Sequence, residues 1–435
     1  MFALSLPNRE GEIIVFQAPR GTQDILPHEQ AYWLFIQKAA EETARLYGYA
    51  RIDTPVFEEA GLFLRTVGAG TDIVEKEMYT FKDLGGGQIT LRPEGTAPVC
   101  RAYIEHGMAS LVQPVKLFYQ SPIFRYERPQ AGRFRQHHQF GFEAIGEGAA
   151  TLDAELIDMA WSFFVALGLK KLTLQINSIG CPVCRPGYLA KLIEHYEAHR
   201  EEICEDCKVR VEKNVLRLLD CKKISCQPFA ATAPRSIDHL CVECSEHFEK
   251  LKINLVALSL PFEINPSMVR GLDYYTKTVF EIQPEEERGQ STIAGGGRYD
   301  GLIEELGGKH TPGVGFATGI ERIILNLQKQ NVPVPEAPKP SVFLVWMGEE
   351  AGKFAAKMVR DLRELEISAV TSYTPRSMKA QLRQADGTGC HFAAIIGEQE
   401  LAQNIITLRD LRTAQQEPIT FSKLVDKIKL PDGGT

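Results

Sequence analysis

The spacing of hydrophobic residues near the start of the chain predicts a long amphipathic helix. Asp24 and Pro27 form a typical helix-start signal, and Gly48 supplies a stop. Between them apolar side chains recur at helical spacing on one face: Trp33, Ile36, Ala40, Ala44 and Tyr47.

After this helix the pattern changes to short apolar runs separated by glycine and proline, which is typical of an antiparallel sheet. We expect strands at Arg51–Phe57, Ile89–Arg92, Val115–Tyr119, Phe124–Glu127, Gln139–Glu143 and Leu172–Asn177, with a helix at Thr151–Leu169. Pro55 lies inside the first strand. Because proline has no N–H to donate, that strand should lie at a sheet edge or an interface.

A second set of strands begins near residue 262. It includes Val279–Ile282 and Ser291–Ala294, and it continues into a strand that turns into a helix over Pro312–Leu327. Residues 181–258, between the two sets, are rich in Cys, Lys and Glu and largely helical in pattern. We interpret them as an insertion between two halves of one sheet domain, residues 1–180 and 259–330.

Residues 331–340 contain four prolines and no periodicity, which predicts a linker. Beyond it the pattern alternates between strand and helix. The expected order is Val342–Met347 (strand), Lys353–Glu366 (helix), Ala369–Tyr373 (strand), Ser377–Ala385 (helix) and His391–Ile396 (strand). This predicts a small α/β domain over residues 341–435 with a parallel or mixed sheet.

Composition excludes several classes of protein. The chain has 435 residues, of which 44% are hydrophobic, and a net charge of −7. No apolar run is long enough to span a membrane, and the first twenty or so residues do not follow the signal-peptide pattern. We expect a cytoplasmic protein without a membrane partner. The acidic balance argues against a protein that coats DNA or RNA, so any nucleic-acid contact should be local.

Eight of the ten cysteines lie within the predicted insertion. They form four close pairs: Cys181 and Cys184, Cys204 and Cys207, Cys221 and Cys226, Cys241 and Cys244. In a cytoplasmic chain this spacing favours a metal, most naturally zinc held by thiolates, over disulfides. The alternative is a set of buried free cysteines, which pack as small hydrophobic side chains. The spacing alone does not say which pairs would share an ion.

Arginine is concentrated in one short segment, where Arg125, Arg128, Arg133 and Arg135 flank a turn at Gly132. Guanidinium groups pair with phosphate oxygens, so this segment could hold a polyphosphate or an RNA end. A solvated charged hairpin is the alternative interpretation.

Four further motifs could carry chemistry. Glu94, Gly95 and Thr96 could hold an ammonium group, or they could simply cap a helix. The run Val269–Tyr275 contains an arginine and two tyrosines, but it could also be an ordinary strand end. In Ala294–Gly301, three glycines precede Arg298 and Tyr299 and permit close approach to a ligand, or they form a glycine-rich hairpin. In Gly313–Arg322, an arginine lies at a predicted helix start, which favours anions. Neither common nucleotide-binding glycine motif is present.

These five motifs, taken in order, resemble the class II aminoacyl-tRNA synthetases and, in detail, the histidyl-tRNA synthetase family, from about Ala18 to the C-terminus. Gly48–Glu58 resembles motif 1, Phe124–Glu143 motif 2 and Gly313–Arg322 motif 3. The runs Arg270–Tyr275 and Gly295–Gly301 resemble the two histidine-specific motifs. The resemblance implies an α+β fold with an antiparallel catalytic sheet, a Cys-rich, mostly helical insertion and a small α/β anticodon-binding domain.

The resemblance also implies a reaction and the residues that carry it. The family joins L-histidine and ATP, expected with Mg, to histidyl-adenylate and then transfers the histidyl group to the 3′ end of tRNA. Arg125 and Arg270 would be catalytic. The ATP-binding set would be Arg125, Glu127, Arg270 and Arg322. The histidine-binding set would be Glu94, Gly95, Thr96, Arg125, Gln139, Glu143, Arg270, Tyr274, Tyr275 and Tyr299.

Arg133, Arg135 and Gln136 would meet the tRNA acceptor end, and motif 1 would form a homodimer interface. His137 departs from the family pattern, since an aromatic residue such as phenylalanine is expected there. A metal pair of His137 and His138 is disfavoured, because adjacent strand residues point to opposite faces. The family does not require a metal in its insertion.

Other functions remain as alternatives. One is a histidine-binding regulatory paralogue of ATP phosphoribosyltransferase that does not charge tRNA. Such paralogues usually lack the C-terminal domain and lose motif residues, both of which this chain retains. A non-catalytic RNA-binding module would not need the three ATP-site arginines. A zinc-ribbon interaction protein would account only for residues 181–244.

Overall fold

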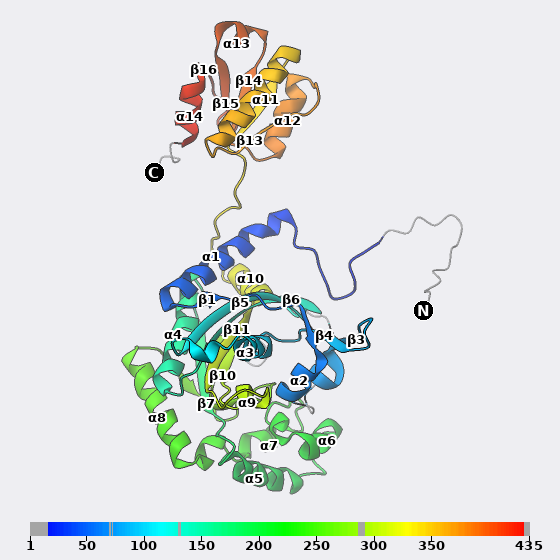
Figure 1. Ribbon diagram of the computed structural model, residues 1–435, viewed down its shortest axis with the longest axis vertical. Coiled ribbons are helices and arrows are strands. Elements are labelled where there is room, and N and C mark those ends of the chain that lie inside the picture. The colour runs from blue at the N-terminus through cyan, green and yellow to red at the C-terminus, as the bar shows by residue number, and fades with distance from the viewer. Residues whose placement is uncertain (1–15, 69–70, 72, 129–131, 286–291, 430–435) are drawn as a thin grey trace, which may run out of the picture. The chain divides into compact units, whose positions relative to one another are not determined.

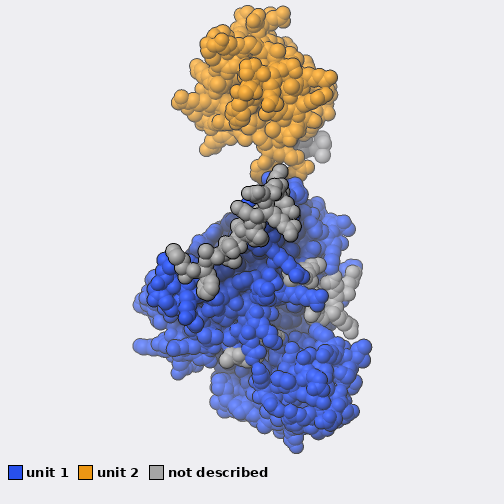
Figure 2. Space-filling model, turned by 90° about the vertical axis from the view of Figure 1, so that its right-hand side faces the viewer, with its two compact units in different colours: residues 1–335 blue, residues 336–435 orange. Residues whose placement is uncertain are grey.

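The computed structural model describes residues 16–68, 71, 73–128, 132–285 and 292–429 (Figure 1). The chain divides into two compact units, residues 1–335 and 336–435 (Figure 2). Each unit has its own buried cores.

The first unit is built on an eight-stranded sheet. Its strand order is β1-β5-β6-β11-β10-β9-β7-β8. The strands are β1 (Ala50–Arg51), β5 (Val115–Phe124), β6 (Gln136–Ile145), β7 (Leu172–Ser178), β8 (Glu263–Ile264), β9 (Thr276–Pro284), β10 (Ala294–Arg298) and β11 (Gly313–Gly319). The six central strands pair antiparallel, while β1 and β8 pair parallel at the two edges. The predicted antiparallel catalytic sheet and α+β class are confirmed.

The predicted strand Arg51–Phe57 is wrong, because the segment is divided between two sheets. β1 ends at Arg51, and β2 (Phe57–Glu59) belongs to a small sheet with β3 (Tyr79–Lys82) and β4 (Gln88–Leu91). Around Pro55, the side chain of Arg92 replaces a neighbouring strand: its Nη1 donates to the carbonyl oxygens of Thr54 and Pro55 at 2.9 and 3.2 Å. Pro55 itself lies between β1 and β2. Both of these strands are at the edges of their sheets, which agrees with the edge position expected from Pro55.

Two other strand predictions need correction. Val115–Tyr119 and Phe124–Glu127 are not separate strands, because β5 runs unbroken to Phe124 and Arg125 lies beyond its end. Pro122 is tolerated inside this strand, and its carbonyl oxygen accepts a hydrogen bond from Arg92 Nε at 2.9 Å. The strand expected at Ser291–Ala294 instead begins at Ala294 and runs to Arg298, and Ser291 lies outside the described residues.

The triple glycine is therefore a strand and not a hairpin turn. A Cβ on Gly296 would lie 2.2 Å from the carbonyl oxygen of Gly315, and one on Gly297 would lie 2.4 Å from that of Thr278. Glycine is required because β9, β10 and β11 approach closely at this point.

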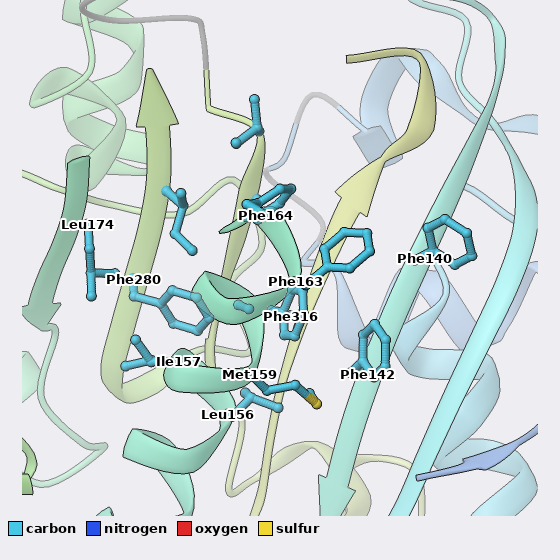
Figure 3. Close-up of a cluster of buried hydrophobic side chains, with 14 of the residues drawn as sticks. Phe140, Phe142, Leu156, Ile157, Met159, Phe163, Phe164, Leu174, Phe280 and Phe316 are labelled. Atoms are coloured by element: carbon cyan, nitrogen blue, oxygen red, sulfur yellow. The ribbon is translucent and has the colours of Figure 1, made fainter. Parts of the chain in front are cut away.

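Helices α4 (Ala150–Ala166), α1 (Gln30–Tyr47), α8 (Val242–Ala257) and α10 (Ile320–Lys329) contribute residues to the main core of this unit. Phe163 and Phe164 of α4 are fully buried against strand residues (Figure 3). Phe142 of β6 stacks on Phe316 of β11 with 5.1 Å between ring centroids. Fully burying such side chains stabilises the fold by about 1.5–3 kcal/mol each. The sheet domain also contains the helices α2 (Ala60–Thr66), α3 (Thr96–Glu105) and α9 (Leu302–Glu305).

The Cys-rich segment between β7 and β8 is helical, as predicted. It contains α5 (Arg185–Glu197), α6 (Glu205–Lys213), α7 (Gln227–Thr232) and α8. A separate small core, made of residues between Tyr188 and Ala233, holds α5, α6 and α7 together.

The second unit has a mixed five-stranded sheet of order β13-β12-β14-β15-β16. The expected strand–helix alternation corresponds to β12 (Val342–Trp346), α11 (Glu349–Glu364), β13 (Ala369–Thr371), α12 (Met378–Gly387) and β14 (Phe392–Ile396). Four further elements follow: α13 (Glu398–Gln403), β15 (Ile406–Asp410), β16 (Gln416–Ile419) and α14 (Phe421–Lys429). In the described part of the chain, no helix is long and apolar enough to cross a membrane.

Candidate active site

A cleft of about 1100 Å³ opens in the first unit and collects most of the predicted site residues. Those that line it are Glu94, Gly95, Thr96, Arg125, Glu127, Arg133, Gln139, Arg270, Tyr274, Tyr275, Tyr299 and Arg322. Strand alternation explains the position of the β6 residues. His137 and Gln139 line the cleft, whereas Phe140 and Phe142 lie in the core.

Glu143 is fully buried and adjoins three residues that line the cleft, Thr96, Tyr299 and Gly315. Thr96 Oγ1 and Tyr299 Oη donate hydrogen bonds to its two carboxyl oxygens at 2.7 and 2.6 Å. Burial raises the pKa of Glu143 to about 8, although these two hydrogen bonds oppose the shift. Gly315 lies against this group, since a Cβ there would be 1.8 Å from Oε2 of Glu143.

Glu94 is also buried, at the start of α3. Its carboxylate accepts hydrogen bonds from the backbone N–H groups of Thr96 and Ala97 at 2.7 and 2.8 Å. The helix-capping alternative is thus realised, and the same carboxylate still lines the cleft. Burial raises the pKa of Glu94, against the lowering effect of these backbone hydrogen bonds.

Arginine side chains gather beside these carboxyl groups. Arg125 Nε donates to the carbonyl oxygen of Pro93 at 2.7 Å, and Arg322 Nη1 donates to that of Thr292 at 2.6 Å. Burial and the neighbouring guanidinium groups of Arg133 and Arg125 lower the pKa of Arg322, against the attraction of Glu127. Positively charged guanidinium groups held close together are suited to bind an anion, because the anion would relieve the repulsion between them.

Arg270 is held by a carboxylate that the sequence analysis did not identify as a site residue. Its Nη1 forms an ion pair with Glu281 of β9, which also accepts a hydrogen bond from Thr292 Oγ1 at 2.8 Å. Burial lowers the pKa of the Arg270 guanidinium, but Glu281 together with Tyr275 and Tyr274 outweighs burial, so the pKa is raised. Gly295 makes room for this pair, because a Cβ there would lie 2.4 Å from Arg270 Nη2.

The three tyrosines predicted for the pocket lie together. The rings of Tyr274 and Tyr275 are 4.7 Å apart, and Tyr299 meets Tyr274 edge-on at 6.0 Å. Burial raises the pKa of all three phenols, so each is a neutral hydrogen-bond donor and acceptor at physiological pH.

Of the three residues predicted to contact tRNA, one lines the cleft and two lie outside its lining. Arg133 lines the cleft and approaches Glu127 at 3.4 Å. Arg135 is outside the lining, with its guanidinium 3.8 Å from the ring centre of Tyr126, and Gln136 begins β6, also outside it. Residues 129–131 of this segment lie outside the described residues.

His137 and His138 have different surroundings, as strand alternation predicts. His137 faces the cleft, where burial and the charge of Arg125 lower its pKa to about 3, so the ring is neutral. His138 Nδ1 contacts Glu321 Oε1 at 2.9 Å. Glu321 also accepts from the backbone N–H of His138 and so ties the start of α10, next to Arg322, to β6.

Comparison with known proteins decides the family. The model of the family described as "Histidyl-tRNA synthetase" matches residues 21–323, and that described as "Anticodon binding domain" matches residues 341–430. A protein of Dehalococcoides mccartyi named "Histidine--tRNA ligase" is 58% identical over 415 residues, covering 95% of this chain and 99% of its own. One of that name from Acetivibrio thermocellus is 46% identical over 414 residues, covering 95% and 99%.

The chain belongs to the histidyl-tRNA synthetase family.

Solved structures agree with this assignment. The apo histidyl-tRNA synthetase of S. aureus is 40% identical, with a TM-score of 0.80, covering 95% of this chain and 100% of its own. A Bacillus halodurans structure titled "ATP phosphoribosyltransferase regulatory subunit/histidyl-tRNA synthetase" is 21% identical, with a TM-score of 0.64, and covers 89% and 99%. At that identity the second comparison supports the fold alone.

Within this family fold, sequence reasoning missed several residues that shape the cleft. Glu281, Thr292 and Glu321 hold Arg270, Arg322 and the start of α10. A weak signal was available, because Glu281 is the one charged residue in the apolar run Val279–Ile282. Its partner is eleven residues away in sequence, across a turn that periodicity does not reveal.

Arg298 has a different role from the one its motif suggested. Its side chain is fully buried and does not line the cleft; it pairs with Asp153 of α4, Nη2 to Oδ1, at 2.7 Å. It therefore connects the glycine strand to the helical layer and is not placed to touch a ligand.

The eight insertion cysteines come together as two groups of four. Cys181, Cys184, Cys241 and Cys244 form the first cysteine cluster, and Cys204, Cys207, Cys221 and Cys226 form the second cysteine cluster. Within each, the four sulfur atoms all lie within 4.8 Å of one another. Cys100 and Cys390 are buried elsewhere.

Proposed function

We propose that this protein is a histidine–tRNA ligase, which activates L-histidine with ATP and transfers the histidyl group to the 3′ end of its tRNA. The observation that carries the proposal is the composition of the cleft. Buried carboxyl and phenol groups lie directly beside a cluster of arginines, as an amino acid and a triphosphate bound side by side would require. The family assignment and the names of the relatives support the same reaction.

Histidine binding is assigned to the acidic and aromatic part of the cleft. Glu94, Thr96 and Gln139 would hold the α-ammonium group, with Gly95 between the first two, while Glu143 and Tyr275 would bracket the imidazole, with Tyr274 and Tyr299 beside it. An imidazole has a donor and an acceptor on opposite edges, which a carboxyl group and a phenol can both recognise. A ligand without ring nitrogens would leave these buried groups unpaired and would therefore be rejected.

ATP binding is assigned to Arg125, Glu127, Arg270 and Arg322. The histidine carboxylate attacks the α-phosphorus in line, the bond to pyrophosphate breaks, and charge develops on the phosphate oxygens. Arg125 and Arg270 would stabilise that charge, and each can pair with two oxygens without losing its own proton. Mg²⁺ bound with ATP would offset further phosphate charge. Catalysis would rest on positioning more than on proton transfer.

Contact with tRNA is assigned to two regions. Arg133, Arg135 and Gln136 would meet the acceptor end beside the cleft, and the second unit would bind the anticodon. We infer a cytoplasmic location, where charged tRNA is used in translation.

We also propose a homodimer formed through the segment that resembles motif 1. Val56 and Phe57 expose 40% and 55% of their surface at β2, and Leu64 of the adjoining α2 exposes 46%. Exposed apolar side chains close together mark an interaction surface. Phe57→Asp should convert the dimer to monomers in light scattering coupled to size exclusion. Ile253→Asp, which changes an apolar residue of α8 that is 66% exposed, should leave the dimer intact, and a wild-type monomer would refute the proposal.

The ligase proposal is tested by ATP–pyrophosphate exchange with each standard amino acid in turn. Exchange should occur with histidine alone and should be abolished in Arg270→Ala. Transfer of labelled histidine to tRNA then tests the second step. Histidine binding in a calorimeter without any exchange would overturn the proposal in favour of the regulatory paralogue.

A further inference from the structure

We propose that each of the two cysteine clusters binds one structural Zn²⁺ ion through four thiolates. The first cysteine cluster would join the base of the insertion to the catalytic sheet, and the second would hold the body of the insertion together. The argument rests on the geometry of the sulfur atoms, the charge around them and the size of the insertion.

The separations between sulfur atoms match a tetrahedral zinc site. Zn–S bonds are about 2.3 Å long, so two sulfurs on one tetrahedral ion lie about 3.8 Å apart. In the first cluster, Cys181 Sγ lies 3.8 Å from the sulfurs of both Cys184 and Cys241, and Cys184 Sγ lies 3.9 Å from that of Cys244. In the second, the sulfurs of Cys204 and Cys221 are 4.0 Å apart. A disulfide would need about 2.05 Å.

The backbone around the clusters favours thiolates. The N–H of Cys181 points at Cys184 Sγ at 3.3 Å, and the N–H of Cys204 points at Cys226 Sγ at 3.2 Å. Cys184 and Cys241 also occupy the N-caps of α5 and α8, where the helix dipole favours negative charge. Two long helices therefore direct their positive ends at the first cluster.

The charge of the thiolates also points to a cation. Four thiolates within 4.8 Å of one another would repel strongly, and a divalent cation between them would offset that repulsion. Zn²⁺ with four thiolates carries a residual charge of about −2. Arg185 beside the first cluster and Lys223 beside the second are placed to interact with that charge.

The size of the insertion gives an independent reason for a metal. Its small core spans only Tyr188 to Ala233, and α6 and α7 have nine and six residues. A segment of this size rarely buries enough apolar surface to hold its own shape, and small domains commonly use metals as cross-links. Because all four positions of each site would be filled by protein, neither ion would have an open position for catalysis.

Both clusters lie next to residues of the cleft. Arg185, which follows Cys184, donates hydrogen bonds to the carbonyl oxygens of Ile179 and Tyr275. Cys221 lies between Asp220 and Lys222, which both line the cleft. The ions would thus fix one edge of the cleft as well as the insertion.

The test is elemental analysis of full-length protein purified without a metal-affinity step. Two zinc ions per chain are expected. Cys241→Ser should remove the first and Cys221→Ser the second, leaving one zinc each, while Cys390→Ser, outside the clusters, should keep two. If a variant fails to fold, wild-type protein treated with a mercurial reagent should release two zinc ions as its thiolates are titrated.

Other results would overturn the proposal. Less than one zinc per several chains, with all ten cysteines free to react under denaturing conditions, would leave the clusters as packed thiols. Iron in place of zinc, visible as strong absorption in the oxidised protein, would refute the assignment of the metal. Two zinc ions that persist in Cys221→Ser would refute the second cluster.

Discussion

At the scale of single residues, Glu143 is a fully buried carboxyl group with a raised pKa. Its pKa is raised to about 8 by burial, whereas an unfolded chain would release this proton near its ordinary value of 4.5. Between these values the folded protein binds the proton more tightly than the unfolded chain, so folding stability falls as the pH rises through this window.

We therefore predict that Glu143→Gln removes a pH dependence of stability. From pH 5.5 to 7.5 the wild type should lose up to about 1.4 kcal/mol per pH unit relative to the variant. Urea unfolding of the first unit at several pH values measures the difference. The exposed control Glu246→Gln should follow the wild type, and parallel curves for wild type and Glu143→Gln would contradict a raised pKa.

Gly295 provides a second prediction at this scale. An alanine there would place its Cβ 2.4 Å from the Arg270 guanidinium, which is the flexible end of a side chain and can move. Gly295→Ala should therefore fold normally but lose about 10²-fold or more in histidine-dependent pyrophosphate exchange, since small misplacements of a positioning group have effects of this size.

The matched control is Gly61→Ala, because nothing lies within 4 Å of a Cβ at that position. This variant should keep wild-type exchange. Normal exchange in Gly295→Ala would mean that the position of Arg270 is not decisive, while a loss of folding would point to strain in β10 instead.

At the scale of elements, the contact between α4 and the sheet depends on one buried polar network. Asp153 is paired with Arg298 and also accepts hydrogen bonds from Thr278 Oγ1 at 2.6 Å and His247 Nε2 at 2.8 Å. Asp153→Asn should reduce the free energy of unfolding by about 1–3 kcal/mol, because it removes one of the two carboxylates that pair with the buried guanidinium, while Asp300 Oδ1 remains 2.9 Å from Arg298 Nη1. Denaturant unfolding of the first unit measures the loss.

An exposed ion pair serves as the control for this network. Arg360 and Glu364 of α11 are 2.9 Å apart, and their side chains are 79% and 63% exposed. Glu364→Gln should cost at most about 0.5 kcal/mol. Equal effects in the two variants would show that burial does not amplify the Asp153 interaction.

The strands of the catalytic sheet show what local pattern can predict about elements. The antiparallel arrangement and the insertion followed from spacing and composition. The division of residues 51–57 between two sheets did not, because Arg92, distant in sequence, provides the hydrogen bonds around Pro55. The glycine strand β10 was also missed, since its reason is the close approach of β9 and β11.

At the scale of the whole molecule, the two units have separate cores and separate family matches. A chain ending at residue 335 should therefore keep histidine-dependent pyrophosphate exchange within a few-fold of the full chain. Charging of tRNA should fall by at least about 10²-fold, because anticodon contacts would be lost along with their share of the binding energy. Undiminished charging would contradict the role proposed for the second unit.

The sequence by itself determined the antiparallel sheet, the helical Cys-rich segment and the family, because these follow from periodicity, from composition and from motifs within short segments. Most of the active-site residues that it indicated do line the cleft, including Glu94, Arg125, Arg270 and Arg322. Only the tertiary structure decided which groups are partners: Glu281 for Arg270, Asp153 for Arg298, and the two sets of four cysteines. Partnership depends on distances between segments far apart in the chain, and a linear pattern does not contain those distances.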